Sequence, residues 1–158
     1  MFVIRTAGPD DVDRVVELQI ALFHEDAGVH DARTDLTWPQ REGHADTSAL
    51  LDSEDATVLV AVADEVAAGF VAGYAAARPA TRQAGRSAVL RSLYVTASQR
   101  RAGAGSALIG AFTEWAKGAG CSEVMVDHYA ANGDAGRLYE SLGFVAQSVS
   151  RSLPLNED

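Results

Sequence analysis

The chain has 158 residues, of which 47% are hydrophobic and 22% are charged, and its formal net charge is −9. This length fits a single domain, 1–158, and the composition excludes a disordered tail. The acidic balance argues against a nucleic-acid-binding protein, because such proteins neutralise phosphates with basic residues. No apolar run approaches the roughly 20 residues of a membrane span, no secretory leader is visible, and one cysteine excludes an internal disulfide. We therefore expect a cytoplasmic protein that binds neither membranes nor nucleic acid.

The charge is divided unevenly between the two halves of the chain. Residues 1–79 hold 15 acidic residues and 5 arginines, whereas residues 80–158 hold 7 acidic and 8 basic residues. An acidic region attracts cationic ligands, and a more basic region accommodates anionic ones. The division favours a site for one cationic and one anionic ligand, although a solvated surface explains the same charges.

The first half of the chain begins with a predicted strand and helix. Val12, Val15, Leu18 and Leu22 recur at helical spacing behind two aspartates that can cap a helix. Apolar, β-prone residues then return after a long polar segment. The predicted elements are a strand over 2–5, a helix over 10–23, and two strands over 57–63 and 66–77 joined by a turn at Asp64 and Glu65.

Residues 24–55 separate this helix from the first central strand. They are polar and weakly periodic, and Gly28, Pro39 and Gly43 interrupt them. We predict a loop with short helices here, one of them over 48–52.

The second half of the chain alternates strands with helices. Its clearest helix shows an apolar stripe of Leu108, Ile109, Phe112, Trp115 and Ala116. This helix follows a predicted strand over 87–95 and ends at Gly118 or Gly120. A strand is predicted next over 123–127. A second helix, with an apolar stripe of Ala135, Leu138, Tyr139 and Leu142, is closed by Gly143, and a strand over 144–150 follows. This order allows a parallel pair of strands around a crossover helix.

Residues 100–105, between a predicted strand and the clearest helix, read Arg-Arg-Ala-Gly-Ala-Gly. Gly103 and Gly105 let the backbone approach a ligand, and the first amides of the helix favour an anion. The two arginines add positive charge. No Gly-Lys-Ser/Thr follows and position 108 is leucine, so the turn is neither a nucleotide-hydrolysing loop nor a dinucleotide fingerprint. The pattern indicates a phosphate-binding turn, with a tight turn that needs glycine for its geometry as the alternative.

Two motifs along the chain have the spacing of a known family. The turn matches the pattern R/Q-x-x-G-x-G/A, and residues 132–144 match N-x-x-A-x-x-L-Y-x-x-x-G-F about 27 positions further on. The sequence Leu-Arg-Ser-Leu-Tyr-Val at 90–95 and the amino-terminal Ile4-Arg5 are also similar. The chain therefore resembles the GNAT superfamily of acyl-CoA-dependent N-acetyltransferases over most of its length, and the likeness is weakest over 24–56.

The resemblance implies a fold and an activity. The fold is α+β in an α/β/α layering, with a mixed, mostly antiparallel central sheet splayed between strands 4 and 5 and flanked by helices. The acceptor side would lie largely in residues 10–56 and the CoA-binding core in residues 87–145. The activity is transfer of an acetyl group from acetyl-CoA to a primary amine, by direct attack in a ternary complex rather than through an acyl-cysteine at Cys121.

The resemblance also assigns residues to acetyl-CoA. Backbone amides of the turn would hold the pyrophosphate, and strand-edge groups near Leu93 and Val95 would pair with the pantetheine and stabilise the oxyanion. Tyr139 would protonate the departing thiolate as a general acid, although it also fits a packing role on its helix. The assigned residues are Leu93, Tyr94, Val95, Arg100, Arg101, Gly103, Ala104, Gly105, Ser106, Asn132 and Tyr139.

The acidic first half favours a cationic acceptor, such as an amino sugar, an aminoglycoside-like antibiotic or a polyamine. Glu25, Asp26 and Trp38 are the candidate acceptor-binding residues. Two alternatives stay open: a non-catalytic acyl-CoA-binding sensor, and an acetyltransferase that acts on a protein or peptide amine. Homodimers are common in the family that the chain resembles, so a homodimer is a further hypothesis.

The general base is not singled out by the sequence. Its candidates are a water chain that ends on one of six residues, or one of these residues itself: His24, Glu25, Asp26, His30, Asp127 and His128. The histidines at 24, 30 and 44, together with Asp46, have spacings that match no zinc pattern. We therefore expect no metal.

Overall fold

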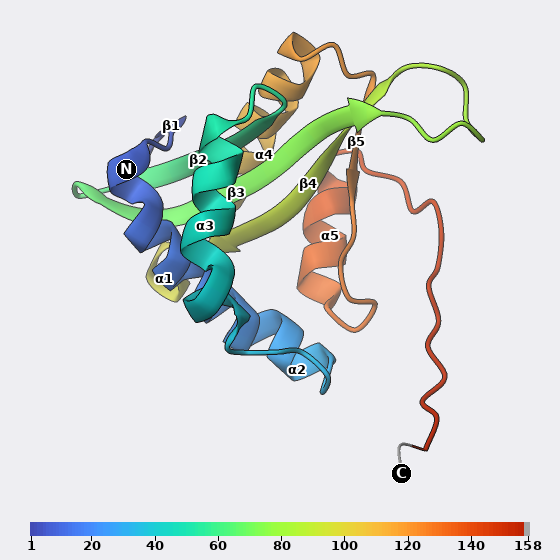
Figure 1. Cartoon of the computed structure of the whole chain (residues 1–158). Helices are drawn as coiled ribbons and strands as arrows, with labels where there is room; N and C mark the ends of the chain where they lie inside the picture. Colours follow the sequence, from blue (N-terminus) through green and yellow to red (C-terminus); the bar gives the residue numbers. More distant parts are fainter. Residues whose placement is uncertain (157–158) are drawn as a thin grey trace.

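Five strands form one sheet in the order β1-β2-β3-β4-β5, with helices on both faces (Figure 1). The computed structural model describes residues 1–156. Neighbouring strands are antiparallel except for β4 and β5, which are parallel. The strands are β1 Val3–Thr6, β2 Ala56–Ala63, β3 Val66–Ala77, β4 Arg86–Val95 and β5 Glu123–Val126, and the helices are α1 Val12–Leu22, α2 Gly28–His30, α3 Trp38–Asp52, α4 Ala104–Gly118 and α5 Gly133–Ser141. Within residues 1–156, no helix has the length and apolar character needed to cross a membrane.

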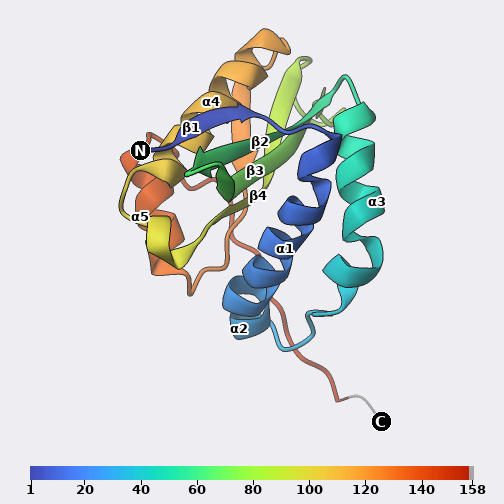
Figure 2. The ribbon, with the colours of Figure 1, turned by 90° about the vertical axis from the view of Figure 1, so that its left-hand side faces the viewer.

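The two faces of the sheet bury separate apolar clusters, because successive strand residues point to opposite sides. α1 and α3 cover one face, and α4 and α5 lie on the other (Figure 2). On the α1 face, Val15 and Leu18 share a cluster with Val58, Val60 and Phe70. These two helices thus fix the position of the segment that joins them.

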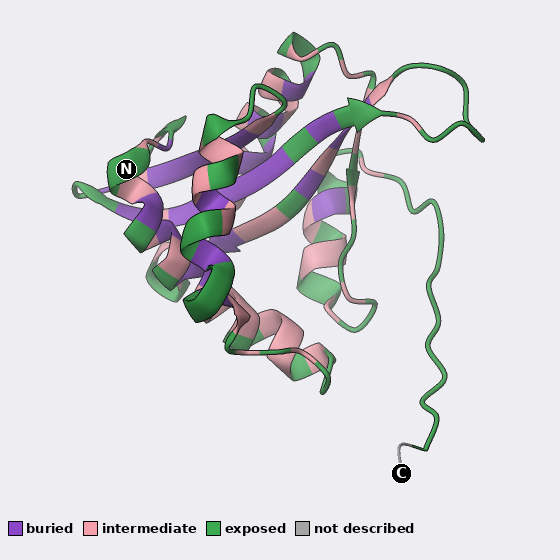
Figure 3. Cartoon of the chain, in the orientation of Figure 1, coloured by how far each residue is buried: buried purple, intermediate pink, exposed green. Residues whose placement is uncertain are grey.

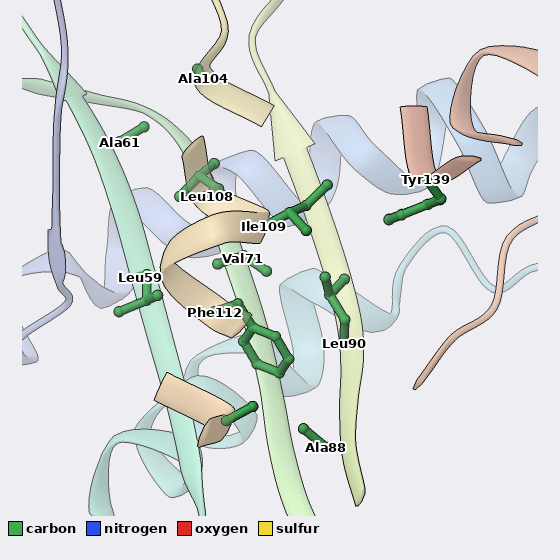
Figure 4. Close-up of a cluster of buried hydrophobic side chains, with 11 residues drawn as sticks. Leu59, Ala61, Val71, Ala88, Leu90, Ala104, Leu108, Ile109, Phe112 and Tyr139 are labelled. Carbon is green, nitrogen blue, oxygen red and sulfur yellow. The ribbon is translucent and has the colours of Figure 1, made fainter. Parts of the chain in front are cut away.

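The α4 face holds the second cluster. Leu108 and Phe112 of α4 are fully buried there with Leu59, Val71 and Leu90 of the strands (Figure 4). Buried residues run along the strands, while the helices expose their outer sides (Figure 3). The predicted α/β/α layering is therefore confirmed.

Pairing between β4 and β5 stops halfway along β4. Residues 87–90 pair with residues 123–126. Directly afterwards Arg91 forms a bulge against β3, where the register shifts by one residue. A bulge bends and twists its strand, and the rest of β4 diverges from β5 (Figure 1). We call residues 87–90 with 123–126 the paired end, and residues 91–95 the open end of β4. The predicted splay between strands 4 and 5 is confirmed.

The paired end is held by a polar network at the start of β5. The carboxylate of Glu123 accepts a hydrogen bond from the Ser87 hydroxyl at 2.6 Å and further hydrogen bonds from both terminal nitrogens of Arg82. The hydrogen bonds from Arg82 and then Ser87 lower the pKa of Glu123 from its ordinary value of 4.5 to about 2. Glu123 therefore stays ionised. It links β5 to β4 through Ser87, and to the loop between β3 and β4 through Arg82.

Gly73 makes the close packing of the paired end possible. It is buried in β3 opposite Leu90. A Cβ on Gly73 would stand 2.2 Å from the Val89 carbonyl oxygen and 2.6 Å from the Phe112 ring. No side chain fits in that space, so α4 packs directly on the β3 backbone.

Two predictions about secondary structure are wrong. The segment over 24–55 is mostly helical: α1 continues into a π-helical turn, Phe23–Ala27, then into α2, and α3 follows. The buried residues of α3 are Pro39, Gly43 and Thr47, which lack the apolar stripe that marks a helix in sequence. The strand predicted over 144–150 is absent, because this segment is extended and pairs with no strand among residues 1–156. The other predicted strands and helices are confirmed.

Candidate active site

A cleft of about 1240 Å³ opens where β4 leaves β5. One wall is the open end of β4 with the turn that leads into α4, and the opposite wall is the end of β5 with α5. Residues of the π-helical turn and α2 form the third side. Pockets for small ligands usually have volumes of about 300–1,000 Å³. The cleft thus has room for two ligands or for one large ligand.

The turn before α4 presents an open backbone surface. Gly103 caps α4 in the left-handed region, with φ of +87°, and a Cβ on it would meet nothing within 4 Å. A Cβ on Gly105 would touch only Leu138, at 3.7 Å. The first amides of a helix have no acceptor within the helix, and no side chain caps this one. These amides are therefore free to bind an anion.

The two arginines of the turn differ in their contacts. Arg100 donates to the Val95 carbonyl at 2.9 Å and to Glu25 at 2.8 Å. Arg101 adopts the left-handed region, with φ of +65°, and forms no ion pair with another residue in the range 1–156. Arg101 is thus the more available cation at the turn, while Arg100 links the turn to the first helical segment.

Glu25 lies on the π-helical turn and is anchored by side chains from β4 and from the turn before α4. Its carboxylate accepts hydrogen bonds from the Tyr94 hydroxyl and from Arg100. These two hydrogen bonds, that of Tyr94 first, lower the pKa of Glu25. Burial, together with Glu25, raises the pKa of Tyr94, and the Arg100 guanidinium lies 5.5 Å from the centre of its ring. The cleft therefore contains a fixed carboxylate that stays negatively charged.

A second link joins the π-helical turn to α5. The Asn132 side chain accepts from the Ala135 amide at 3.1 Å, which caps α5, and donates to Asp26 at 3.0 Å. His30 lies 3.6 Å from the same Asp26 carboxylate. Asn132 thus sets the distance between the acidic side of the cleft and the helix that carries Tyr139.

Tyr139 lies on the inner side of α5 and is 7% exposed. Its ring stacks on His128 at 5.9 Å and meets Phe144 edge-on at 5.3 Å. Burial, and then the negative charge of Asp26, raise the pKa of Tyr139 to about 12. Tyr139 lines the cleft, and its hydroxyl makes no hydrogen bond to another residue between 1 and 156. Tyr139 is therefore a protonated, unpaired donor.

The cleft brings together most of the residues assigned from the sequence. They are Leu93, Tyr94, Val95, Arg100, Arg101, Gly103, Gly105, Ser106, Asn132, Tyr139, Glu25 and Asp26, with the base candidates His24, His30, Asp127 and His128. The side chain of Ala104 is buried in the α4 cluster, so only its backbone is available. Trp38 stacks on Phe23, with ring centres 5.9 Å apart, instead of lining the cleft.

Sequence reasoning missed how these residues are joined. The hydrogen bond between Tyr94 and Glu25 spans 69 positions, and no local pattern signals it. Acidic residues of the first half also meet arginines of the second half in three ion pairs, Asp46 with Arg91, Asp55 with Arg86 and, in the cleft, Glu25 with Arg100. Within residues 1–156, no group of three His, Cys, Asp or Glu side chains could hold a metal ion.

A sequence profile described as the acetyltransferase (GNAT) family matches residues 20–144, well over half of the chain. An aminoglycoside N(6')-acetyltransferase type 1 from Klebsiella aerogenes is 38% identical over 90 residues, which is 56% of this chain. The chain spans 59% of the length of that relative.

Solved structures share the fold over nearly the whole chain. A transcriptional regulator from Bacillus halodurans has a TM-score of 0.80, with 22% identity over 98% of this chain and 100% of the other. Aminoglycoside N-acetyltransferase AAC(6')-Iy in complex with CoA has a TM-score of 0.77, with 22% identity over 99% of this chain and 95% of the other. At such identities the likeness shows the fold alone.

Proposed function

The chain belongs to the acetyltransferase (GNAT) family, and from this premise we propose that it transfers an acetyl group from acetyl-CoA to a primary amine of a small cationic amino sugar. The observation that carries the proposal is the separation of β4 from β5 beside an open turn at the start of α4. A relative of 38% identity is an aminoglycoside N(6')-acetyltransferase, which supports the acceptor class.

The turn fits the pyrophosphate of acetyl-CoA. Gly103 and Gly105 leave open the space that side chains would fill, and the free amides of the first turn of α4 point into it. Arg101 adds positive charge and forms no ion pair with any of residues 1–156. Next to the turn, the open end of β4 offers unpaired backbone groups to an extended ligand, as a strand edge does in peptide recognition.

The reacting end of the cleft needs an oxyanion site and an acid. When bound, acetyl-CoA supplies an activated acetyl thioester. A backbone amide near Val95 would stabilise negative charge on the carbonyl oxygen, because the strand holds it in place before that charge develops. Tyr139 is protonated at neutral pH, as any tyrosine with a pKa near 10 or, as here, raised to about 12 would be, so it has a proton to donate to the departing sulfur.

The acidic side of the cleft would hold the acceptor. Glu25 stays ionised, since Tyr94 and Arg100 lower its pKa. A lowered pKa makes a carboxylate a weak base, so Glu25 would attract an ammonium group of the acceptor rather than remove a proton. The proton of the attacking amine would go to one of the other candidates in the cleft, His24, Asp26, His30, Asp127 or His128.

The wider setting of the proposal is a small-molecule enzyme of the cytoplasm, where a single cysteine stays reduced. We also propose that the working form is a homodimer.

Acetyl-CoA binding is the first test, with calorimetry as the measurement. Gly105→Leu places a side chain in the turn and should weaken binding by at least about 100-fold, or about 2.7 kcal/mol. Gly118→Leu is the matched control, because it makes the same change in α4 where a Cβ meets nothing within 4 Å. Absence of binding to the folded wild type would overturn the proposal.

Acceptor turnover is the second test. Release of free thiol should be detected with aminoglycosides, and Glu25→Gln should raise the acceptor KM about tenfold by removing one close charge. Glu54→Gln is the control, since Glu54 is exposed in the turn between α3 and β2 and does not line the cleft. Acetyl-CoA binding without turnover on any amine would identify a non-catalytic sensor, and turnover only on peptide amines would identify the protein-modifying alternative.

A further inference from the structure

His128 follows the end of β5 with one ring nitrogen bound and the other free. Its Nδ1 lies 2.9 Å from the Tyr129 carbonyl oxygen. A carbonyl oxygen can only accept a hydrogen bond, so Nδ1 of the neutral ring carries the hydrogen and donates it. Nε2 is left with a lone pair, and it makes no hydrogen bond to another residue in the range 1–156. The Tyr129 carbonyl thus fixes the tautomer in which Nε2 can accept a proton.

The free side of the His128 ring faces α5. A Cβ on Gly136 would stand 3.4 Å from Cε1 of His128 and 3.7 Å from Nε2. Gly136 and Tyr139 are three positions apart on α5 and therefore share a face of this helix. The ring of His128 also stacks on that of Tyr139, with ring centres 5.9 Å apart and an angle of 18° between the ring planes. The nitrogen that can accept a proton thus lies over the same turn of helix as the Tyr139 side chain.

The closeness of these two rings suits the transfer of an acyl group. In such a reaction the attacking nitrogen and the departing sulfur are bonded to the same carbon. The group that takes a proton from the nitrogen and the group that gives one to the sulfur must therefore lie close together. His128 and Tyr139 are in ring contact and both line the cleft. His128 is exposed, so an acceptor amine can reach it.

The neighbouring base candidates have other partners. Nε2 of His30 lies 3.6 Å from the Asp26 carboxylate. That carboxylate in turn accepts a hydrogen bond from Asn132, at 3.0 Å. Of the base candidates in the described part of the chain, His128 is the one whose ring stacks on Tyr139.

We propose that Nε2 of His128 accepts the proton of the attacking amine. As the amine nitrogen bonds to the thioester carbon, its proton passes to Nε2, and His128 becomes an imidazolium. The carbon–sulfur bond breaks, and Tyr139 gives its proton to the sulfur. The imidazolium then returns a proton to the Tyr139 oxygen, so that both side chains regain their starting forms and the products are an amide and a thiol. This inference rests on the proposed function and adds the group that takes the proton.

The tautomer of His128 can be measured on the protein alone. Nitrogen NMR of the histidine rings, at a pH where His128 is neutral, should show a hydrogen on Nδ1 and none on Nε2. Tyr139→Phe should leave this tautomer unchanged, because the Tyr129 carbonyl fixes it. A neutral His128 ring with its hydrogen on Nε2 would overturn the proposal whatever the activity, because that nitrogen would have no lone pair for the amine proton.

His128→Asn is the kinetic test. The asparagine amide can still donate to the Tyr129 carbonyl, but it does not take up a proton at neutral pH. We expect kcat with an aminoglycoside to fall by about 100-fold, with the dissociation constant of acetyl-CoA and the melting temperature unchanged. His44→Asn is the matched control, because the His44 side chain is 71% exposed on α3 and does not line the cleft.

His128→Ala separates proton transfer from packing, because it removes an exposed ring that a small base can replace. Imidazole added to the solution should restore kcat of His128→Ala in proportion to its concentration, and it should have no effect on Tyr139→Phe. If the wild type is active, a kcat of His128→Asn within about twofold of it, or a His128→Ala that imidazole does not rescue, would overturn the role of His128 alone. A folded wild type that transfers no acetyl group to any amine would overturn the proposed function as well.

Discussion

The two ends of β4 belong to one strand, yet they make opposite kinds of contact. At the paired end, β4 has β3 on one side and β5 on the other, and Ala88 and Leu90 are buried. At the open end it keeps β3 and loses β5, and the free edge faces the cleft. The bulge at Arg91 is the boundary between them.

This difference shows how a sheet acquires a binding site. The open end has no unusual composition, since Leu93 and Val95 would suit any strand. What changes is the neighbouring strand: where β5 no longer pairs with β4, the backbone groups on that edge of β4 are available to a ligand. Contacts at the paired end should therefore govern stability, and contacts at the open end should govern activity.

The largest expected effect tests the paired end. Gly73→Ala should lower the free energy of unfolding by about 3 kcal/mol, because its Cβ overlaps the Val89 carbonyl and Phe112. The melting temperature should fall by roughly 10 °C. Gly118→Ala in α4, where the added Cβ meets nothing within 4 Å, is the control and should leave the melting temperature unchanged or raise it. Equal melting temperatures for the two variants would contradict the packing argument.

The second effect tests the open end. Tyr139→Phe keeps the ring that packs on His128 and Phe144 and removes only the proton donor. We expect kcat to fall by about 100-fold, with KM for the amine within about twofold and an unchanged melting temperature. Since the pKa of Tyr139 is about 12, the wild-type rate should show no loss from its ionisation between pH 6 and 9 or so. Tyr74→Phe removes an exposed hydroxyl on β3 and is the control. A parallel loss of kcat and stability would mean that Tyr139 acts only in packing.

The smallest effect returns to the paired end and concerns pH. The pKa of Glu123 is about 2 in the folded protein, below its ordinary 4.5, so its contribution to stability is present above pH 4.5 and is lost as the pH falls toward 2. Glu123→Gln should flatten this part of the curve of melting temperature against pH, by no more than about 2 °C because the pair is solvent-exposed. Glu54→Gln should leave the curve as it is. A wild-type curve without any fall in this window would rule out the contribution.

Much of the fold could be predicted from the sequence because local patterns encode it. Continuous runs of apolar residues mark β2 and β3, and the stripe that includes Leu108 and Phe112 marks α4. The proposed phosphate-binding turn can be predicted for a related reason: a site built from backbone needs glycines at set positions, and the sequence shows where the glycines are.

The remainder depends on contacts between distant residues. α3 was missed because it packs closely on α1 through Gly43, where a Cβ would stand 2.9 Å from Gln19, so it buries small residues rather than leucines. The network around Glu25 requires Tyr94 from another element. The strand predicted over 144–150 finds no partner strand among residues 1–156, and a local pattern does not show whether a partner is within reach.

The π-helical turn over Phe23–Ala27 has a consequence for how the acceptor range can evolve. A π-turn holds one residue more than an α-turn. Loss of a single codon there would restore α geometry and rotate the residues that follow, His30 among them, by about 100°. Such length changes would redirect several cleft side chains in one step, while the turn at 100–105, which we propose binds the acyl donor, would stay as it is. Small insertions and deletions in this one helix could therefore change the acceptor range of descendants of this protein, while the turn at 100–105 keeps its sequence.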